Sequence, residues 1–135
     1  MNFLEFKSYY QIKEHHLDTF GHVNNATYLQ LFEQARWDII TEHGYSLEEI
    51  HKMKQGPVVL EVNVKFLKEL RNRENITIVS QGREFSGKVG TMLQKIEKEN
   101  SEVACEGLFK FGFFDHKSRR LIDPPESWLR AIGQK

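Results

Sequence analysis

A hydrophobic pattern typical of a helix lies between residues 26 and 43 of the chain. Apolar residues recur there at steps of three and four, the spacing of one buried face of an α-helix; they are Tyr28, Leu31, Phe32, Ala35, Ile39 and Ile40. Asparagine is favoured at helix N-caps because its side chain accepts hydrogen bonds from backbone N–H groups, and Asn25 lies at the start of this pattern. Gly44 can end a helix. The pattern predicts a buried or half-buried helix from about Ala26 to His43, with its N-cap at Asn25 or close to it.

Period-two alternation predicts strands before and after this helix. The first spans Phe3 to His15, with Leu4, Phe6, Tyr10 and Ile12 on its buried face. The later strands are Val58–Lys68, Glu74–Phe85, Val89–Lys98 and Glu102–Asp115. The last carries apolar residues on both faces, which is typical of a strand inside a sheet.

Two shorter helices complete the expected elements. Ser46 begins a capping-box pattern that predicts a helix to about Met53, and Pro124-Pro125 introduces a final helical segment through Ile132. Packing one long helix on an antiparallel sheet covers these apolar stripes. We therefore expect a single α+β domain over residues 1–135.

Composition excludes several classes of protein. Lysine plus arginine equals aspartate plus glutamate at 19 each, so no net field favours nucleic acid. No apolar run approaches the ~20 residues of a membrane span, and the N-terminus lacks the apolar core of a signal peptide. The single Cys105 fits a reducing compartment and a structural role. We expect a soluble, cytoplasmic protein.

The stretch from Leu17 to Arg36 joins a polar loop directly to the long helix. Asp18 lies just ahead of the predicted helix start. Unpaired N–H groups and the positive end of the helix dipole stabilise negative charge there. Acyl transfer needs both parts: a carboxylate that acts as nucleophile or base, and donors for a carbonyl oxygen.

This stretch resembles the signature of the hotdog-fold thioesterases of the 4-hydroxybenzoyl-CoA thioesterase-like family. That signature runs Asp-x-x-Gly-His-Val-x-x-x-x-Tyr, followed by Phe-Glu-x-Ala-Arg. The matching residues are Asp18, Gly21, His22, Val23, Tyr28, Phe32, Glu33, Ala35 and Arg36. The resemblance implies an antiparallel sheet of about five strands wrapped around one long helix. It also implies an acyl-CoA thioesterase without cofactor, active as a homodimer or homotetramer with its site at the subunit interface.

The resemblance assigns roles at the start of the helix. Asp18 would be the catalytic carboxylate, although aspartate before a helix is commonly only a turn or capping residue. The backbone N–H of Asn25 would hold the thioester oxygen, while its side chain could simply cap the helix. His22 is either a general base or a scaffold that orients Asp18 and the loop.

Three further residues are candidate substrate contacts. Asn24 either shapes the loop or touches substrate, and Tyr28 either bounds the acyl pocket or belongs to the core. Glu33 is spaced for an i,i+3 ion pair with Arg36 on the helix surface, or approaches the cleft of a partner subunit. No group of residues has metal-ligand spacing.

Two alternatives to acyl-CoA hydrolysis remain open from the sequence. One is an acyl-carrier-protein thioesterase, and the other is a non-catalytic module that binds acyl thioesters in the same cleft. The segment 68–75 lacks the proline and Gly-Asp found in many relatives, so the turn there is not predicted in detail. Asn24-Asn25 replaces aromatic or histidine residues of several relatives, so their acyl preferences do not transfer.

Overall fold

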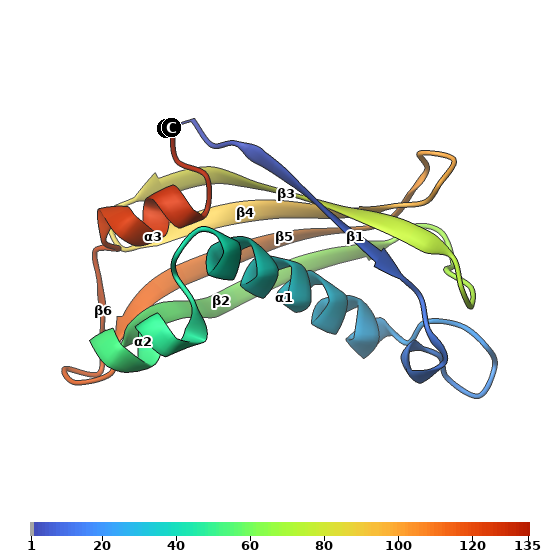
Figure 1. Cartoon of the computed structure of the whole chain (residues 1–135), viewed down its shortest axis with the longest axis horizontal. Coiled ribbons are helices and arrows are strands. Elements are labelled where there is room, and N and C mark those ends of the chain that lie inside the picture. The colour runs from blue at the N-terminus through green and yellow to red at the C-terminus, as the bar shows by residue number, and fades with distance from the viewer. Residues whose placement is uncertain (1) are drawn as a thin grey trace.

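An antiparallel β-sheet is the frame of the protein (Figure 1). The computed structural model describes residues 2–135. Five strands lie in the order β1-β3-β4-β5-β2, and the short β6 pairs with β5 beyond the end of β4. The bounds are β1 Glu5–Gln11, β2 Gln55–Phe66, β3 Asn75–Ser86, β4 Val89–Glu97, β5 Val103–Asp115 and β6 Arg120–Ile122. The two edges of the five-stranded order are therefore β1 and β2.

The long helix α1, Asn25–Glu42, runs along one face of this sheet (Figure 1). Its N-cap is Asn24, whose Oδ1 accepts a hydrogen bond from the Ala26 N–H at 2.8 Å. The helices α2, Leu47–Met53, and α3, Glu126–Ala131, lie at the end of the molecule opposite the start of α1. A single 3-10 turn, Glu14–His16, follows β1.

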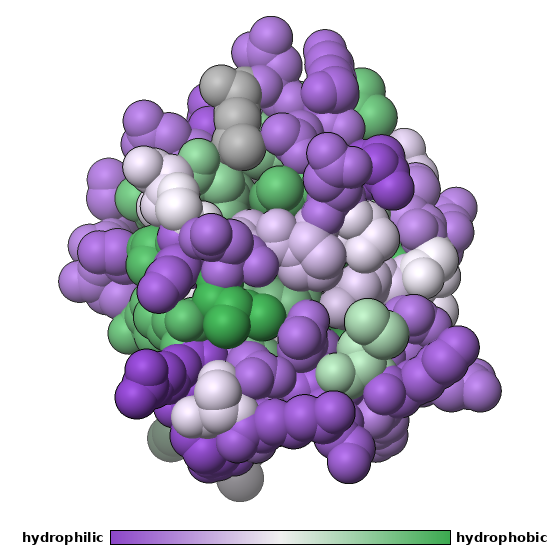
Figure 2. All heavy atoms as spheres, turned by 90° about the vertical axis from the view of Figure 1, so that its left-hand side faces the viewer, coloured by the Kyte–Doolittle hydropathy of each residue, from purple (hydrophilic) through white to green (hydrophobic). Residues whose placement is uncertain are grey.

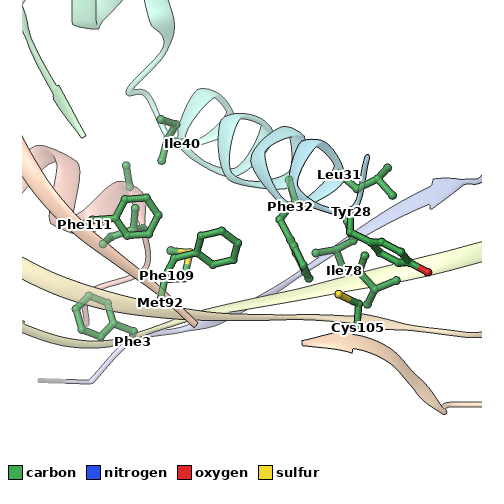
Figure 3. Close-up of a cluster of buried hydrophobic side chains, with 14 of the residues drawn as sticks. Phe3, Tyr28, Leu31, Phe32, Ile40, Ile78, Met92, Cys105, Phe109 and Phe111 are labelled. Atoms are coloured by element: carbon green, nitrogen blue, oxygen red, sulfur yellow. The ribbon is translucent and has the colours of Figure 1, made fainter. Parts of the chain in front are cut away.

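The core lies between α1 and the sheet (Figure 3). All six apolar residues of the predicted helix face are buried, as expected. Phe32 is fully buried and meets the Phe109 ring edge-on at a centroid distance of 5.5 Å. Cys105 is fully buried as a free thiol, and burial raises its pKa to about 12. The thiol is therefore protonated at neutral pH, which suits the structural role expected of it.

The strand β2, predicted as Val58–Lys68, is an exposed edge of the sheet. Its apolar residues Leu60, Val62 and Phe66 alternate with polar ones along the chain, but they are 46%, 38% and 53% exposed. The reason is position: β2 ends the strand order, so only β5 pairs with it among residues 2–135. Leu4 is likewise exposed, while Ile12 of the same predicted face is fully buried.

Several element boundaries differ from the prediction. β1 ends at Gln11, because the 3-10 turn occupies the residues assigned to its end. β2 begins at Gln55, directly after the left-handed residue Lys54 that ends α2. β6 was not predicted; with three residues it is too short to show a period.

The surface at the α2 and α3 end combines charged and apolar regions (Figure 2). Hydrophilic side chains surround an apolar area near the middle of this view. The chain termini also meet, since Phe3 forms an isolated β-bridge with Gln134. No helix in residues 2–135 combines the length and hydropathy needed to cross a bilayer.

Candidate active site

Asp18 lies in a small closed loop before α1. Its backbone N–H donates to the His22 carbonyl at 2.9 Å, and an isolated β-bridge joins Leu17 to Val23. One carboxylate oxygen, Oδ1, accepts from the backbone N–H groups of Phe20 at 2.9 Å and His22 at 3.2 Å. Within residues 2–135 no hydrogen bond or ion pair engages Oδ2. The loop thus fixes one carboxylate oxygen and leaves the other free at the surface.

The first turn of α1 leaves one donor free. The Asn24 side chain accepts a hydrogen bond from the Ala26 N–H. The Asn24 backbone carbonyl accepts from the N–H groups of Thr27 at 2.9 Å and Tyr28 at 3.3 Å. No acceptor in the described chain takes the Asn25 N–H. Because Asn24 supplies the cap, the Asn25 side chain is not needed for it. An anion at the end of α1 would meet this N–H and the positive end of the helix dipole.

A shallow cleft of about 340 Å³ opens beside the helix start. It is lined by His22, Val23, Asn25, Tyr28, Phe66, Leu67, Lys68 and Glu69. Tyr28 is 5% exposed and packs on Phe66 at a centroid distance of 5.4 Å, and burial raises its pKa to about 12. Tyr28 thus belongs to the core and also forms one wall of the cleft. Asp18 stands outside this lining, on the exposed loop.

His22 joins the Asp18 loop to the segment after β2. Its Nε2 lies 3.4 Å from Glu69 Oε2, and both side chains are about half exposed. Glu69 also accepts a hydrogen bond from Arg71 Nε at 2.7 Å. This hydrogen bond, and to a smaller extent the charge of His22, holds the Glu69 pKa below its ordinary value. The sequence missed Glu69 because only the fold brings it beside His22.

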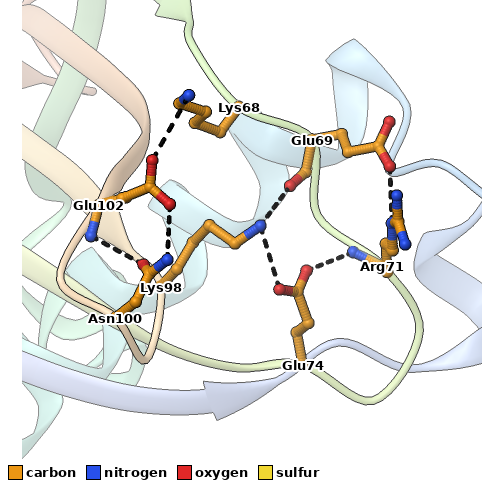
Figure 4. A network of polar contacts seen from close by, with 7 residues as sticks. All are labelled: Lys68, Glu69, Arg71, Glu74, Lys98, Asn100 and Glu102. Carbon is orange, nitrogen blue, oxygen red and sulfur yellow. Dashed lines mark hydrogen bonds and ion pairs between the residues drawn. The ribbon is translucent and has the colours of Figure 1, made fainter.

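Glu69 belongs to a larger surface network of charges (Figure 4). Lys98 Nζ lies 3.2 Å from Glu74 and donates to the Glu69 carbonyl at 3.1 Å, while Lys68 lies 3.4 Å from Glu102. These contacts tie the segment after β2 to the β4–β5 turn. They order the segment at 68–75 whose turn the sequence left undefined.

A second cavity of similar volume lies between the C-terminal half of α1, the sheet and α3. Its volume is about 350 Å³, and apolar and aromatic side chains dominate its lining: Trp37, Ile39, Ile40, Pro57, Val58, Val59, Phe85, Met92, Phe111, Trp128 and Ile132, together with Glu33 and Arg36. A groove along β2 shares Glu33, Arg36 and Val59 with it. The cavity and the groove therefore adjoin at these three residues.

The expected ion pair between Glu33 and Arg36 is absent from residues 2–135, and that expectation was wrong. Arg36 instead packs inward: its guanidinium carbon lies 4.5 Å from the Phe109 centroid and 5.3 Å from that of Phe111. Burial lowers the Arg36 pKa to about 10, an effect that the Glu33 charge partly opposes. Arg36 lies four residues after Phe32 and four before Ile40, so it belongs to the buried stripe of α1. The predicted ion pair did not take this spacing into account.

Gln94 holds Arg36 in this position. Its side chain is fully buried on β4, and its Nε2 donates to the Phe32 carbonyl at 3.1 Å and to Ser80 Oγ at 3.0 Å. Its Oε1 accepts from Arg36 Nη1 at 2.9 Å. Every hydrogen-bonding group of the Gln94 amide group thus has a partner, which fixes the Arg36 side chain.

Comparison with known proteins identifies the family. The family model described as the Thioesterase-like superfamily matches residues 12–132. The chain belongs to this superfamily. FadM of Escherichia coli strain K12, a long-chain acyl-CoA thioesterase, is 31% identical to this thioesterase over 113 residues, which cover 83% of the chain and 85% of FadM.

Solved structures place the thioesterase in the hotdog fold. The probable thioesterase YbaW of Escherichia coli superposes with a TM-score of 0.83 and 26% identity, covering 95% of this chain and 98% of YbaW. SAV2348 of Staphylococcus aureus, solved in complex with CoA, has a TM-score of 0.88 at 21% identity, with 98% of this chain and 84% of SAV2348 covered. The predicted hotdog fold is confirmed, and the protein is a thioester hydrolase.

Proposed function

We propose that the protein hydrolyses acyl-CoA thioesters, with Asp18 as the catalytic carboxylate and the Asn25 N–H as the donor to the thioester carbonyl oxygen. The likeness to FadM, a long-chain acyl-CoA thioesterase, supports CoA thioesters as the substrate class. One observation carries the assignment of residues: a loop carboxylate with one free oxygen precedes a helix whose first N–H is also free.

The reaction uses these two groups on opposite sides of the thioester carbonyl. Asp18 either attacks the carbonyl carbon itself or removes a proton from the water that attacks it. Negative charge develops on the carbonyl oxygen and is stabilised by the Asn25 N–H and the α1 dipole. In the base route, the proton that Asp18 takes from water passes to the CoA sulfur as the carbon–sulfur bond breaks, and the acyl group leaves as the acid. In the nucleophilic route, breaking this bond releases CoA thiolate and leaves the acyl group on Asp18 as a mixed anhydride, which water then hydrolyses to the free acid and the Asp18 carboxylate.

The loop contacts explain why Asp18 would be ready for either role. Two backbone N–H groups hold Oδ1, so the carboxylate does not have to be ordered when substrate binds. His22 contributes one of these donors through its main chain, while its ring is directed to Glu69. We therefore assign His22 a positioning role rather than that of general base.

The proposed active form is a dimer joined along β2. Val59, Leu60 and Val62 are 43%, 46% and 38% exposed on a strand edge that no strand in residues 2–135 covers. Exposed apolar edges favour pairing with another strand. A two-fold axis makes such self-pairing antiparallel, so the Phe66 end of one β2 lies beside the Val58 end of the other. The helix start of one copy then approaches the cavity of the second.

A charge on this edge tests the dimer. Val62→Lys places like charges near each other across the two-fold axis, and we expect the dimer dissociation constant to rise by at least about tenfold. Specific activity should fall with the dimer fraction. Analytical ultracentrifugation and turnover, each measured over a range of protein concentrations, check this. Tyr9→Lys, on the opposite edge β1, is the matched control. Equal loss of dimer in both variants contradicts the β2 interface.

The function itself is tested by thiol release. Purified protein is expected to liberate free CoA from straight-chain acyl-CoAs, and parallel reactions with carrier-protein-linked acyl groups establish which thioester it prefers. Binding without thiol release, seen as stabilisation by acyl-CoA alone, would overturn hydrolysis in favour of a binding module. Release only from the carrier protein would overturn the CoA assignment.

A further inference from the structure

The cavity between α1 and α3 has a buried wall at α3 and an exposed wall at β2. The groove along β2 is lined by Leu29, Gln30, Glu33, Arg36, Val59, Val62 and Phe109, and it meets the cavity at Glu33, Arg36 and Val59. Trp128 and Ile132 line the cavity but not the groove. Both are only 3% exposed, whereas Val58 and Val59 of β2 in the same lining are 36% and 43% exposed, so the buried wall of the cavity lies at α3.

The chemistry of the walls matches an alkyl chain. The only charged side chains in the cavity lining are Glu33 and Arg36, which also line the groove. Beyond them the walls are aliphatic or aromatic, and such a surface gains free energy by excluding water from apolar atoms. A volume of about 350 Å³ holds roughly a dozen groups of water or methylene size, at ~30 Å³ each.

Neighbouring side chains fix Arg36, which lines both the cavity and the groove. Arg36 is stacked over Phe109 and Phe111 and bonded to the fully buried Gln94. Its guanidinium therefore cannot swing into the cavity without losing these contacts. The walls of the cavity are preformed, so a bound chain would not have to reorganise them.

We propose that this cavity receives the alkyl tail of the acyl group and that Ile132 and Trp128 set the longest tail that fits. The inference rests on the proposed function, because it assumes that acyl-CoA is the substrate. In the β2-paired dimer, the cavity of one copy serves the Asp18 of the other. The short helix α3 is then the specificity element of the enzyme, although it lies at the opposite end of the molecule from the Asp18 loop of its own chain.

The position of Trp128 makes α3 a firm boundary. Its indole lies against the rings of Phe85 and Phe113 at centroid distances of 5.3 and 5.2 Å. Ile132 follows one turn later, and its N–H donates to the Trp128 carbonyl at 3.0 Å. A tail that reaches this wall has to displace packed side chains to go further, which costs more than one more buried methylene gains.

The test is the dependence of kcat/KM on acyl length, measured with saturated straight-chain acyl-CoAs. In the wild type, each added methylene should raise kcat/KM by roughly fourfold until the tail fills the cavity. Ile132→Ala removes three carbon atoms from the far wall and should move the optimum to tails about two carbons longer. Ile132→Phe should move it to shorter tails.

Ile96→Ala is the matched control. Ile96 is fully buried on β4 and lines none of the cavities described above, so the same deletion should lower stability without moving the optimum. Ile132→Val serves if the alanine variant does not fold. The inference is overturned if the Ile132 variants are active but prefer the same acyl length as the wild type. It is also overturned if Ile96→Ala shifts the preferred acyl length by the same amount. Absence of thiol release at every chain length instead overturns the proposed function.

Discussion

Replacing Asp18 by Asn is expected to lower kcat by at least about 100-fold, the smaller end of the usual contribution of a catalytic acid or base. An amide cannot accept a proton from water at neutral pH and is a poor nucleophile. Asn keeps a carbonyl oxygen at Oδ1, so it can still accept the bonds from Phe20 and His22. The loop should therefore remain closed, and the loss should be confined to the chemical step.

Steady-state thiol release gives kcat and KM for both proteins, and thermal unfolding checks the fold. We expect the melting temperature to stay close to that of the wild type and KM to change little. His22→Ala is a useful comparison, since it removes the contact with Glu69 but keeps the backbone donor to Asp18. Wild-type turnover in Asp18→Asn would exclude this carboxylate from catalysis.

Replacing Asn25 by Pro is expected to reduce kcat by about 100- to 1,000-fold, the usual cost of losing one oxyanion donor. Proline removes the N–H itself, and it is well tolerated at the first position of a helix. The preceding residue, Asn24, has φ −69° and ψ 148°, a conformation compatible with a following proline. The helix start can therefore accept the substitution without moving.

Asn25→Ala is the matched variant, because it deletes the side chain and keeps the N–H. Its kcat should remain within about threefold of the wild type, since Asn24 already caps α1. Circular dichroism of both variants checks that the helix persists. Equal activity of the proline and alanine variants would show that another group holds the carbonyl oxygen.

The sequence predicted the long helix well because its burial depends on a local period. All six residues on its predicted face are buried, and the helix begins and ends within a residue of the expected positions. Arg36 was placed wrongly, because charge was taken as a sign of exposure. Its position four residues from both Phe32 and Ile40 indicated burial more reliably than its charge indicated exposure. The Phe109 ring and the buried Gln94 amide accommodate the charge.

Partners distant in the chain could not be predicted from local patterns. Gln94 occupies an inward position of β4 between Met92 and Ile96, so alternation marks it as buried but not as the partner of Arg36. Glu69 meets His22 across 47 positions of the sequence, counted as 69 − 22. The alternation of β2 predicted a strand correctly, but nothing local indicated that this strand lies at the edge of the sheet.

The resemblance located the candidate chemistry, and the structure adds the geometry around it. The motif indicated Asp18 and the start of the helix, whereas the free Oδ2 and the free Asn25 N–H are visible only once the loop is folded. The catalytic roles of Asp18, Asn25 and His22 and the substrate contacts of Asn24, Tyr28 and Glu33 stay predictions. The position of Asn24 as N-cap favours the loop-shaping alternative for that residue.

A crystal structure of Asp18→Asn with an intact acyl-CoA tests the central arrangement most directly. We expect the thioester carbonyl oxygen at about 3 Å from the Asn25 nitrogen, with the carbonyl carbon facing the side chain at position 18. A thioester bound elsewhere, with its oxygen held by other donors and its carbon out of reach of position 18, would contradict it.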